Sequence, residues 1–320
     1  MTLPVIDDDD LPEDLYHYTD AGGLHGILES NRLWATHAAY LNDSQEFVYG
    51  MQVIINELSA WVKDVPEEAK QGWDPALPLP GVMIPVAIWL SAAAVAAHLQ
   101  QRTQFLRQNF GPFVTCLSEE GDQLSQWRGY GGGGGYAIRF DPQALRESVQ
   151  RNGVPSDQRL PGMTPGQVPV GARRFVKMEY EPETQAPLLR SQLVGFINAI
   201  SGVLTTQRLP QTVLEQRRNE IVEPFLGWLL GTRFKHPGFK EEKEYRIVTF
   251  SPPELFSPQD TGLVPRVNIE FDPSCITEVW IGPGQHMDTR ESSVRAYLQR
   301  HQDRYPNVTV HRSETPFTGI

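Results

Sequence analysis

Short β-rich segments, separated by helical patterns, recur along the 320-residue chain and constrain its fold more than any other feature. The clearest are residues 15–19 (LYHYT), 113–117 (FVTCL), 136–140 (YAIRF) and 244–250 (EYRIVTF). Each is rich in the β-branched and aromatic residues that suit a half-buried pleated surface. We therefore predict an α+β fold in which short strands form a sheet and helices connect them.

The helical segments carry recognisable start signals. Asp20 is placed to cap a helix that runs to about Ser30. Residues 33–40 predict a second strand or turn, followed by a helix that is capped by one of residues 42–44 and reaches about Trp61. Residues 122–130 predict a helix, and the five glycines at 131–135 that follow favour a flexible connector over a phosphate-binding loop. Two further helices are expected within residues 183–230, and a βαβ unit within residues 279–311.

Composition excludes several classes of protein. The formal net charge is −11, which argues against coating of nucleic acid, because that mode needs clustered lysine and arginine. The hydrophobic fraction of 40% argues against disorder. The two cysteines, Cys116 and Cys275, form no CxxC pattern, so neither a disulfide framework nor a cysteine zinc site is expected.

One uncharged stretch bears on location. Residues 75–101 contain no Asp, Glu, Lys or Arg, and residues 82–99 are long enough to cross a bilayer. Many of them are alanine, and Pro85, Ser91 and His98 interrupt the apolar run, so we favour a buried helix without membrane contact. The first ten residues lack the basic and apolar regions of a signal peptide, and we expect a cytoplasmic protein.

Two sets of polar residues are candidates for chemistry. His17 lies in the first predicted strand, between Tyr16 and Tyr18. Glu242 and Glu244 are expected at the start of an apolar strand, where their i, i+2 spacing directs both carboxylates to one face, which Arg246 continues. Such a stripe suits a polar substrate and stabilises developing positive charge. The sequence contains no HExxH, GxSxG or GxxxxGK[ST] motif.

The order of the motifs resembles a known family. The series LYHYT, YLND..E, FVTCLSE......W..Y and E.EYRI resembles the bacterial domain-of-unknown-function family 2971 along nearly the whole chain. A more distant resemblance is to ADP-ribosyltransferases, which hold NAD in a split, strongly bent mixed β-sheet surrounded by helices. It implies one domain over residues 1–320, with the core in about 11–250 and a C-terminal βαβ extension in about 264–320.

The second resemblance also implies roles for individual residues. His17 matches the first-strand histidine that binds the ribose beside nicotinamide, Glu244 matches the catalytic glutamate of a later strand, and Glu242 completes an ExE pair. Tyr40 or Tyr130 would stack on nicotinamide, and Ser118 or Ser125 would replace a mid-strand serine. The remaining residues expected to bind NAD are Tyr18, Thr19, Arg128 and Arg246.

The implied activity is cleavage of the nicotinamide–ribose bond of NAD, without a metal, and transfer of ADP-ribose to protein, nucleic acid or water. The alternative is a ligand-sensing or protein-interaction module in which Trp34, Trp127 and Tyr130 form a packed core and Glu242 pairs with Arg246. A third hypothesis is a metal-dependent hydrolase that uses Asn42, Asp43 and Glu46.

Overall fold

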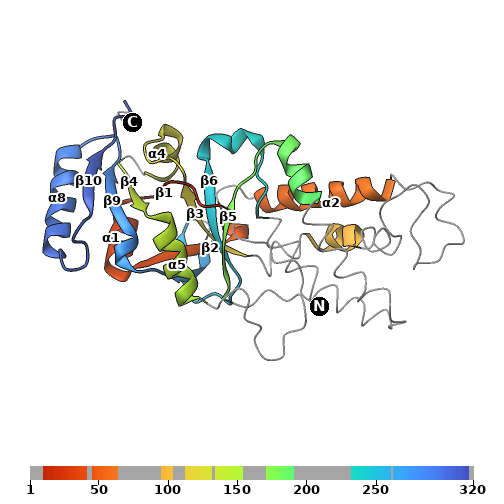
Figure 1. Ribbon diagram of the computed structural model, residues 1–320, viewed down its shortest axis with the longest axis horizontal. Helices are drawn as coiled ribbons and strands as arrows, with labels where there is room; N and C mark the ends of the chain where they lie inside the picture. The colour runs from red at the N-terminus through yellow and green to blue at the C-terminus, as the bar shows by residue number, and fades with distance from the viewer. Residues whose placement is uncertain are drawn as a thin grey trace, which may run out of the picture.

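The computed structural model describes residues 10–41, 45–63, 95–103, 112–131, 134–153, 171–190, 232–260 and 262–316 (Figure 1). Its strands are β1 Leu15–Thr19, β2 Arg32–His37, β3 Phe113–Ser118, β4 Tyr136–Phe140, β5 Arg173–Lys177, β6 Glu244–Thr249, β7 Leu255–Gln259, β8 Gly262–Glu270, β9 Ile276–Ile281 and β10 Thr309–Arg312. The helices include α1 Ala21–Ser30, α2 Glu46–Lys63, α4 Leu124–Tyr130, α5 Pro142–Asn152 and α8 Met287–Arg300, and short 3₁₀ helices include η1 Ala38–Tyr40, η4 Pro237–Glu242 and η5 Pro273–Cys275.

The strands form one open, mixed sheet, which confirms the α+β fold. Its order is β10-β9-β4-β1-β3-β2-β8-β7, and β6 pairs with β3 and β5 outside that path. Strands β9 and β10 are parallel, as the βαβ prediction requires, and the other named pairs are antiparallel. Strands from the C-terminal part of the chain lie at both ends of this order. At one end β8 lies between β2 and β7, and at the other β9 lies between β4 and β10.

The sheet splits at β3. One edge of β3 pairs with β6 along its full length. The opposite edge is shared, because Ser118 at one end pairs with Tyr16 of β1, while Phe113 and Val114 at the other end pair with β2. Strands β1 and β2 therefore separate beside the middle of β3. The prediction of a split sheet is confirmed by this pairing.

Local signals explain why the first helix forms where it does. The Asp20 carboxylate accepts a hydrogen bond from the backbone N–H of Gly23 at 2.7 Å, which satisfies a donor that the first turn leaves unpaired. Asn31 ends the helix in the left-handed region, with φ 52°, and its N–H donates to the carbonyl of Ile27. Helix α1 is thereby held between β1 and β2.

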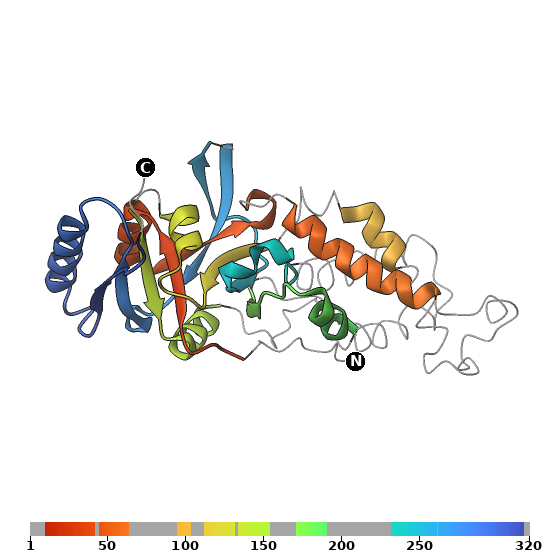
Figure 2. The ribbon, with the colours of Figure 1, turned by 90° about the horizontal axis from the view of Figure 1, so that it is seen from above.

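The main core lies between the sheet and three helices. Leu24, Ile27 and Leu28 of α1 pack in one buried cluster with side chains of α5 and α8 and of most strands. Burial of an aliphatic side chain of this size contributes roughly 1.5–3 kcal/mol. Figure 2 shows that α2 instead extends away from the sheet, so the sheet and its three helices form the rigid frame of the site.

Some predictions concern residues outside the described ranges. These are the helix-capping residues 42–44, most of the uncharged segment, and residues 191–230 of the two helices expected within 183–230, of which residues 183–190 are described and helical. Residues 95–103, which include the end of the uncharged segment, are helical. In the part of the chain that the structure describes, no helix combines the length and the apolar character that a membrane crossing requires.

Candidate functional site

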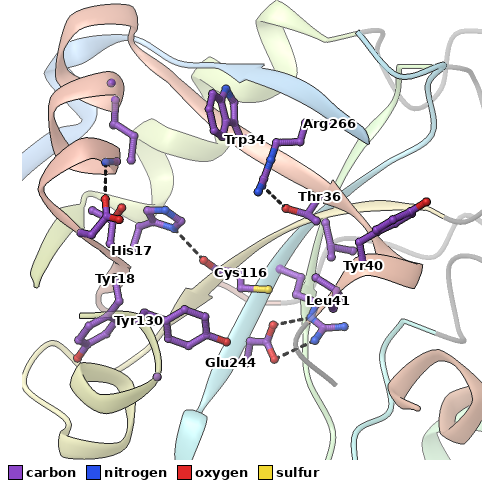
Figure 3. A pocket seen from close by; sticks show the side chains of 18 of the residues that line it. His17, Tyr18, Trp34, Thr36, Tyr40, Leu41, Cys116, Tyr130, Glu244 and Arg266 are labelled. Atoms are coloured by element: carbon purple, nitrogen blue, oxygen red, sulfur yellow. Dashed lines mark hydrogen bonds and ion pairs between the residues drawn. The ribbon is translucent and has the colours of Figure 1, made fainter. Parts of the chain in front are cut away.

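A cleft of about 1160 Å³ lies where β1 and β2 separate (Figure 3). All four strands around the split contribute to its wall, with His17 from β1, Trp34 and Thr36 from β2, Cys116 from β3, and Glu244 from β6. Drug-sized ligands usually occupy pockets of roughly 300–1,000 Å³, so the volume suits a larger molecule such as a dinucleotide. His17 and Glu244 share this cleft although 226 positions separate them in the sequence.

His17 is held by the middle of β3, on the edge of the strand that pairs with neither β1 nor β2 at that point. Its Nδ1 lies 3.0 Å from the backbone carbonyl oxygen of Cys116. Because a carbonyl only accepts, Nδ1 must carry the proton and donate it, so in the neutral ring Nε2 is an acceptor. Burial lowers the pKa of His17, which favours this neutral form, while the hydrogen bond to Cys116 opposes the shift. The ring thus offers a hydrogen-bond acceptor without a full charge.

Glu244 belongs to a buried cluster of charged groups. Arg246 binds both of its carboxylate oxygens, through Nε at 2.6 Å and Nη2 at 2.9 Å, and Lys235 Nζ donates to Oε2 at 2.8 Å. Glu46 pairs with both cations, and Glu242 accepts from Lys235 at 2.6 Å. With all five groups ionised, three carboxylates face two cations, and the cluster carries one net negative charge.

The two carboxylates of the ExE pair differ in their environments. Burial alone would raise the pKa of Glu244, but Arg246 and Lys235 reverse this and lower it to about 2. Burial raises the pKa of Glu242, and Lys235 only partly offsets the shift. Glu244 is therefore a fixed anion, whereas Glu242 is the better candidate for taking up a proton.

The prediction that both glutamates lie on one strand is wrong. Glu242 ends the 3₁₀ helix η4, and β6 begins only at Glu244. Between them Lys243 adopts the left-handed conformation, with φ 42°, which turns the chain into the strand. The carboxylates still meet because both bind Lys235. Arg246 pairs with Glu244 and Glu46, so the predicted pair of Glu242 with Arg246 is also wrong.

Aromatic residues and the start of α1 complete the wall near His17. Tyr18, Thr19, Tyr40 and Tyr130 all line the cleft. The hydroxyl of Tyr18 donates to the carbonyl of Glu120 at 2.6 Å, whereas the Tyr40 and Tyr130 side chains are partly exposed. A Cβ at position 23 would collide with the Thr19 hydroxyl, so glycine is required at that position of α1.

Three residues expected to bind NAD are absent from the cleft wall. Ser118 is buried, and its hydroxyl donates to the backbone carbonyl of Glu242 at 2.9 Å. Ser125 and Arg128 both lie on α4 outside the lining, and Arg128 is exposed. Arg246 does line the cleft, but its guanidinium is bound by Glu244 and Glu46 and by the carbonyl of Thr232.

Some residues named in the two alternative hypotheses do not lie where those hypotheses place them. Trp127 packs in a small cluster with Tyr16 and Tyr18, but Trp34 is 50% exposed, so Trp34 and Trp127 form no common packed core. Glu46, proposed as a metal ligand, is buried between Lys235 and Arg246. Among the described residues no group of three metal-binding side chains occurs, and Asn42 and Asp43 lie outside them.

The sequence analysis did not identify Lys235 as a site residue, and it did not identify Glu46 as a member of the charged cluster. Lys235 lies in a segment with no regular strand or helix, beside the single bridge between Glu179 and Phe234. Glu46 begins α2, where an acidic residue is expected simply as a favourable helix start. Only the tertiary structure brings these residues to β6.

Comparison with known proteins places the chain beside a family without known chemistry. No curated protein and no solved structure matches the chain. The matched segment, residues 126–247, holds most of α4, the strand YAIRF and the cluster residues Lys235, Glu242, Glu244 and Arg246. Over these residues the chain matches the family described as "Protein of unknown function (DUF2971)". The match includes the motifs W..Y and E.EYRI, whereas LYHYT, YLND..E and FVTCLSE lie before it.

Proposed function

We propose that the protein cleaves the nicotinamide–ribose bond of NAD and transfers ADP-ribose to a macromolecular acceptor or to water. One observation carries the proposal: His17 and Glu244 line one cleft, at the split of the sheet, whose volume suits a dinucleotide. The transferase class and the use of NAD come from the resemblance in motif order, and a cytoplasmic location is part of the same proposal.

The charged cluster suits this chemistry. When the bond between ribose C1′ and the nicotinamide nitrogen breaks, its electron pair leaves with nicotinamide and positive charge builds on the sugar. The cluster of Glu46, Glu242, Glu244, Lys235 and Arg246 has one net negative charge, and ion pairs among its members hold them in place. Fixed charge of this kind stabilises the transition state more than the ground state.

Two further roles follow from the site. Neutral His17 offers Nε2 to a ribose hydroxyl, which can donate to it. The acceptor group forms its new bond to C1′ and must release a proton. Glu242 is a carboxylate of the cleft whose pKa is raised by burial, and we assign it that proton.

The test is nicotinamide release from NAD by the purified protein and by Glu244→Gln. Loss of a principal electrostatic stabiliser costs ~100-fold or more in rate. Glu147→Gln is the matched control, because Glu147 is exposed on α5 and does not line the cleft. Equal rates in Glu244→Gln and the wild-type protein would remove Glu244 from the reaction, and absence of release in wild type would refute the proposal.

A ligand-sensing module is the second candidate, and one observation favours it. Both oxygens of Glu244 already bind cations, an arrangement that also suits a purely structural ion pair. Such a module binds NAD without cleaving it. Calorimetry with NAD, followed by assay of free nicotinamide in the same sample, separates the two candidates.

A further inference from the structure

A second charged feature of the cleft is Arg266 of β8. Its guanidinium is held by two hydroxyl groups: Nε donates to Ser257 Oγ at 2.5 Å, and Nη1 donates to Thr36 Oγ1 at 2.6 Å. Thr36 and Arg266 are direct partners in the pairing of β2 with β8, which fixes the position of the side chain. Arg266 is only 9% exposed, yet it lines the cleft.

Among the residues that the structure describes, no neighbour balances the charge of Arg266. Within the described ranges no carboxylate forms an ion pair with it, whereas Arg246 and Arg32, which line the same cleft, each pair with a glutamate. Burial lowers the pKa of Arg266, and no nearby charge opposes this shift. Buried charges in proteins are normally paired, so an unbalanced guanidinium beside a cleft is suited to an anion that arrives with a ligand.

The aromatic residue beside Arg266, Trp34, restricts the class of ligand that the site suits. The guanidinium lies 5.0 Å from the ring centre of Trp34, which is half-exposed and also lines the cleft (Figure 3). The planar guanidinium matches the oxygens of a phosphate group, and an exposed indole can stack on a nucleobase. Of the three nitrogens of Arg266, Nη2 makes no hydrogen bond to the described residues.

We infer that Arg266 and Trp34 form a subsite for the phosphate group and the base of a nucleotide. The acidic cluster of Glu242 and Glu244 lies in the same cleft, so the site offers a cation for phosphate and a net negative charge for an electron-poor sugar. The identity of the nucleotide as the ADP part of NAD rests on the proposed function. The binding of phosphate by Arg266 does not.

Calorimetric titration with inorganic pyrophosphate and with ADP tests the subsite. We expect both to bind the wild-type protein, and Arg266→Gln to weaken both by about tenfold or more, since a hydrogen bond to a charged group is lost. Arg32→Gln removes the same charge from a residue of the cleft that already has a carboxylate partner, and we expect a change of less than about threefold. Equal weakening in both variants, or no binding in wild type, would overturn the inference.

A second measurement does not depend on the folding of Arg266→Gln. Phosphate bound beside Arg266 should change the fluorescence of Trp34, and Trp34→Phe, at a half-exposed position, should abolish that change while pyrophosphate still binds. The same fluorescence change in Trp34→Phe would place the anion elsewhere and overturn the inference. Pyrophosphate and ADP binding at Arg266 without nicotinamide release from NAD would refute the transfer reaction and leave the subsite intact.

Discussion

Glu242 and Glu244 accept hydrogen bonds from one ammonium group, the Nζ of Lys235, at 2.6 and 2.8 Å. Glu244 starts a buried strand and Glu242 ends a 3₁₀ helix, so this lysine joins two elements that the backbone alone would direct differently. The two carboxylates of the ExE motif therefore lie close together because both bind Lys235, as much as because of their two-residue spacing.

Replacing Lys235 with methionine should destabilise the protein strongly. The change leaves two buried carboxylates and the partly buried Glu242 with only Arg246, and removal of one partner from a buried ion pair costs roughly 3–5 kcal/mol. Lys240→Met is the matched control, because Lys240 is exposed and lies 3.7 Å from Glu181, where about 0–1 kcal/mol is expected. Urea unfolding measures both. Similar losses in the two variants would contradict a central role for Lys235.

The assignment of proton uptake to Glu242 predicts a pH dependence. A base works when deprotonated, and burial raises the pKa of Glu242 above its ordinary value of 4.5. The rate of transfer should therefore fall as the pH drops through that raised pKa, and Glu242→Gln should remove this acid limb together with much of the rate. The measurement is kcat/KM for nicotinamide release against pH. An unchanged acid limb in Glu242→Gln would assign the proton to another group.

Local signals predicted the frame of the site well. The strand of His17, the Asp20 cap and the strand that follows Glu244 were all found from short runs of residues, because capping and β-rich patterning act over a few positions. These predictions are confirmed. They also identified His17 and Glu244, which the structure brings into one cleft.

The sequence alone did not indicate the contacts that these residues make in the folded chain. Lys243 adopts a left-handed conformation without being glycine or asparagine, so nothing local marks Glu244, rather than Glu242, as the first residue of β6. Arg266 meets Thr36 only through the register of β2 with β8, 230 residues apart. Long-range pairing of this kind leaves no periodic signal, which is why Lys235 and Arg266 had to come from the structure.

His37 should make stability depend on pH in the acid range. Burial lowers its pKa from 6.5 to about 4, and its Nδ1 accepts a hydrogen bond from the N–H of Ala39. Below pH 6.5 the unfolded chain binds a proton that the folded chain does not, so this contribution is complete above pH 6.5 and is lost as the pH falls toward 4.

The expected loss from His37 is on the order of 1–3 kcal/mol. His37→Asn keeps a hydrogen-bond acceptor but does not titrate, so its unfolding free energy should fall less than that of wild type between pH 6.5 and 4. Urea unfolding at several pH values measures the difference between the two proteins. A constant difference across this range would show that His37 does not titrate on unfolding.

Two substitutions of His17 separate its structural contact from its proposed contact with NAD. His17→Phe removes the donor to the Cys116 carbonyl in the gap between β1 and β2, and leaving that acceptor unpaired should cost about 1–3 kcal/mol of stability. His17→Asn keeps an N–H donor and should cost less. Neither variant has the Nε2 acceptor, so both should lose affinity for NAD, measured by calorimetry, whereas only His17→Phe should show the larger loss in urea unfolding. If His17→Asn binds NAD as tightly as wild type, Nε2 does not contact the ligand. His17 then acts only through its hydrogen bond to the Cys116 carbonyl of β3.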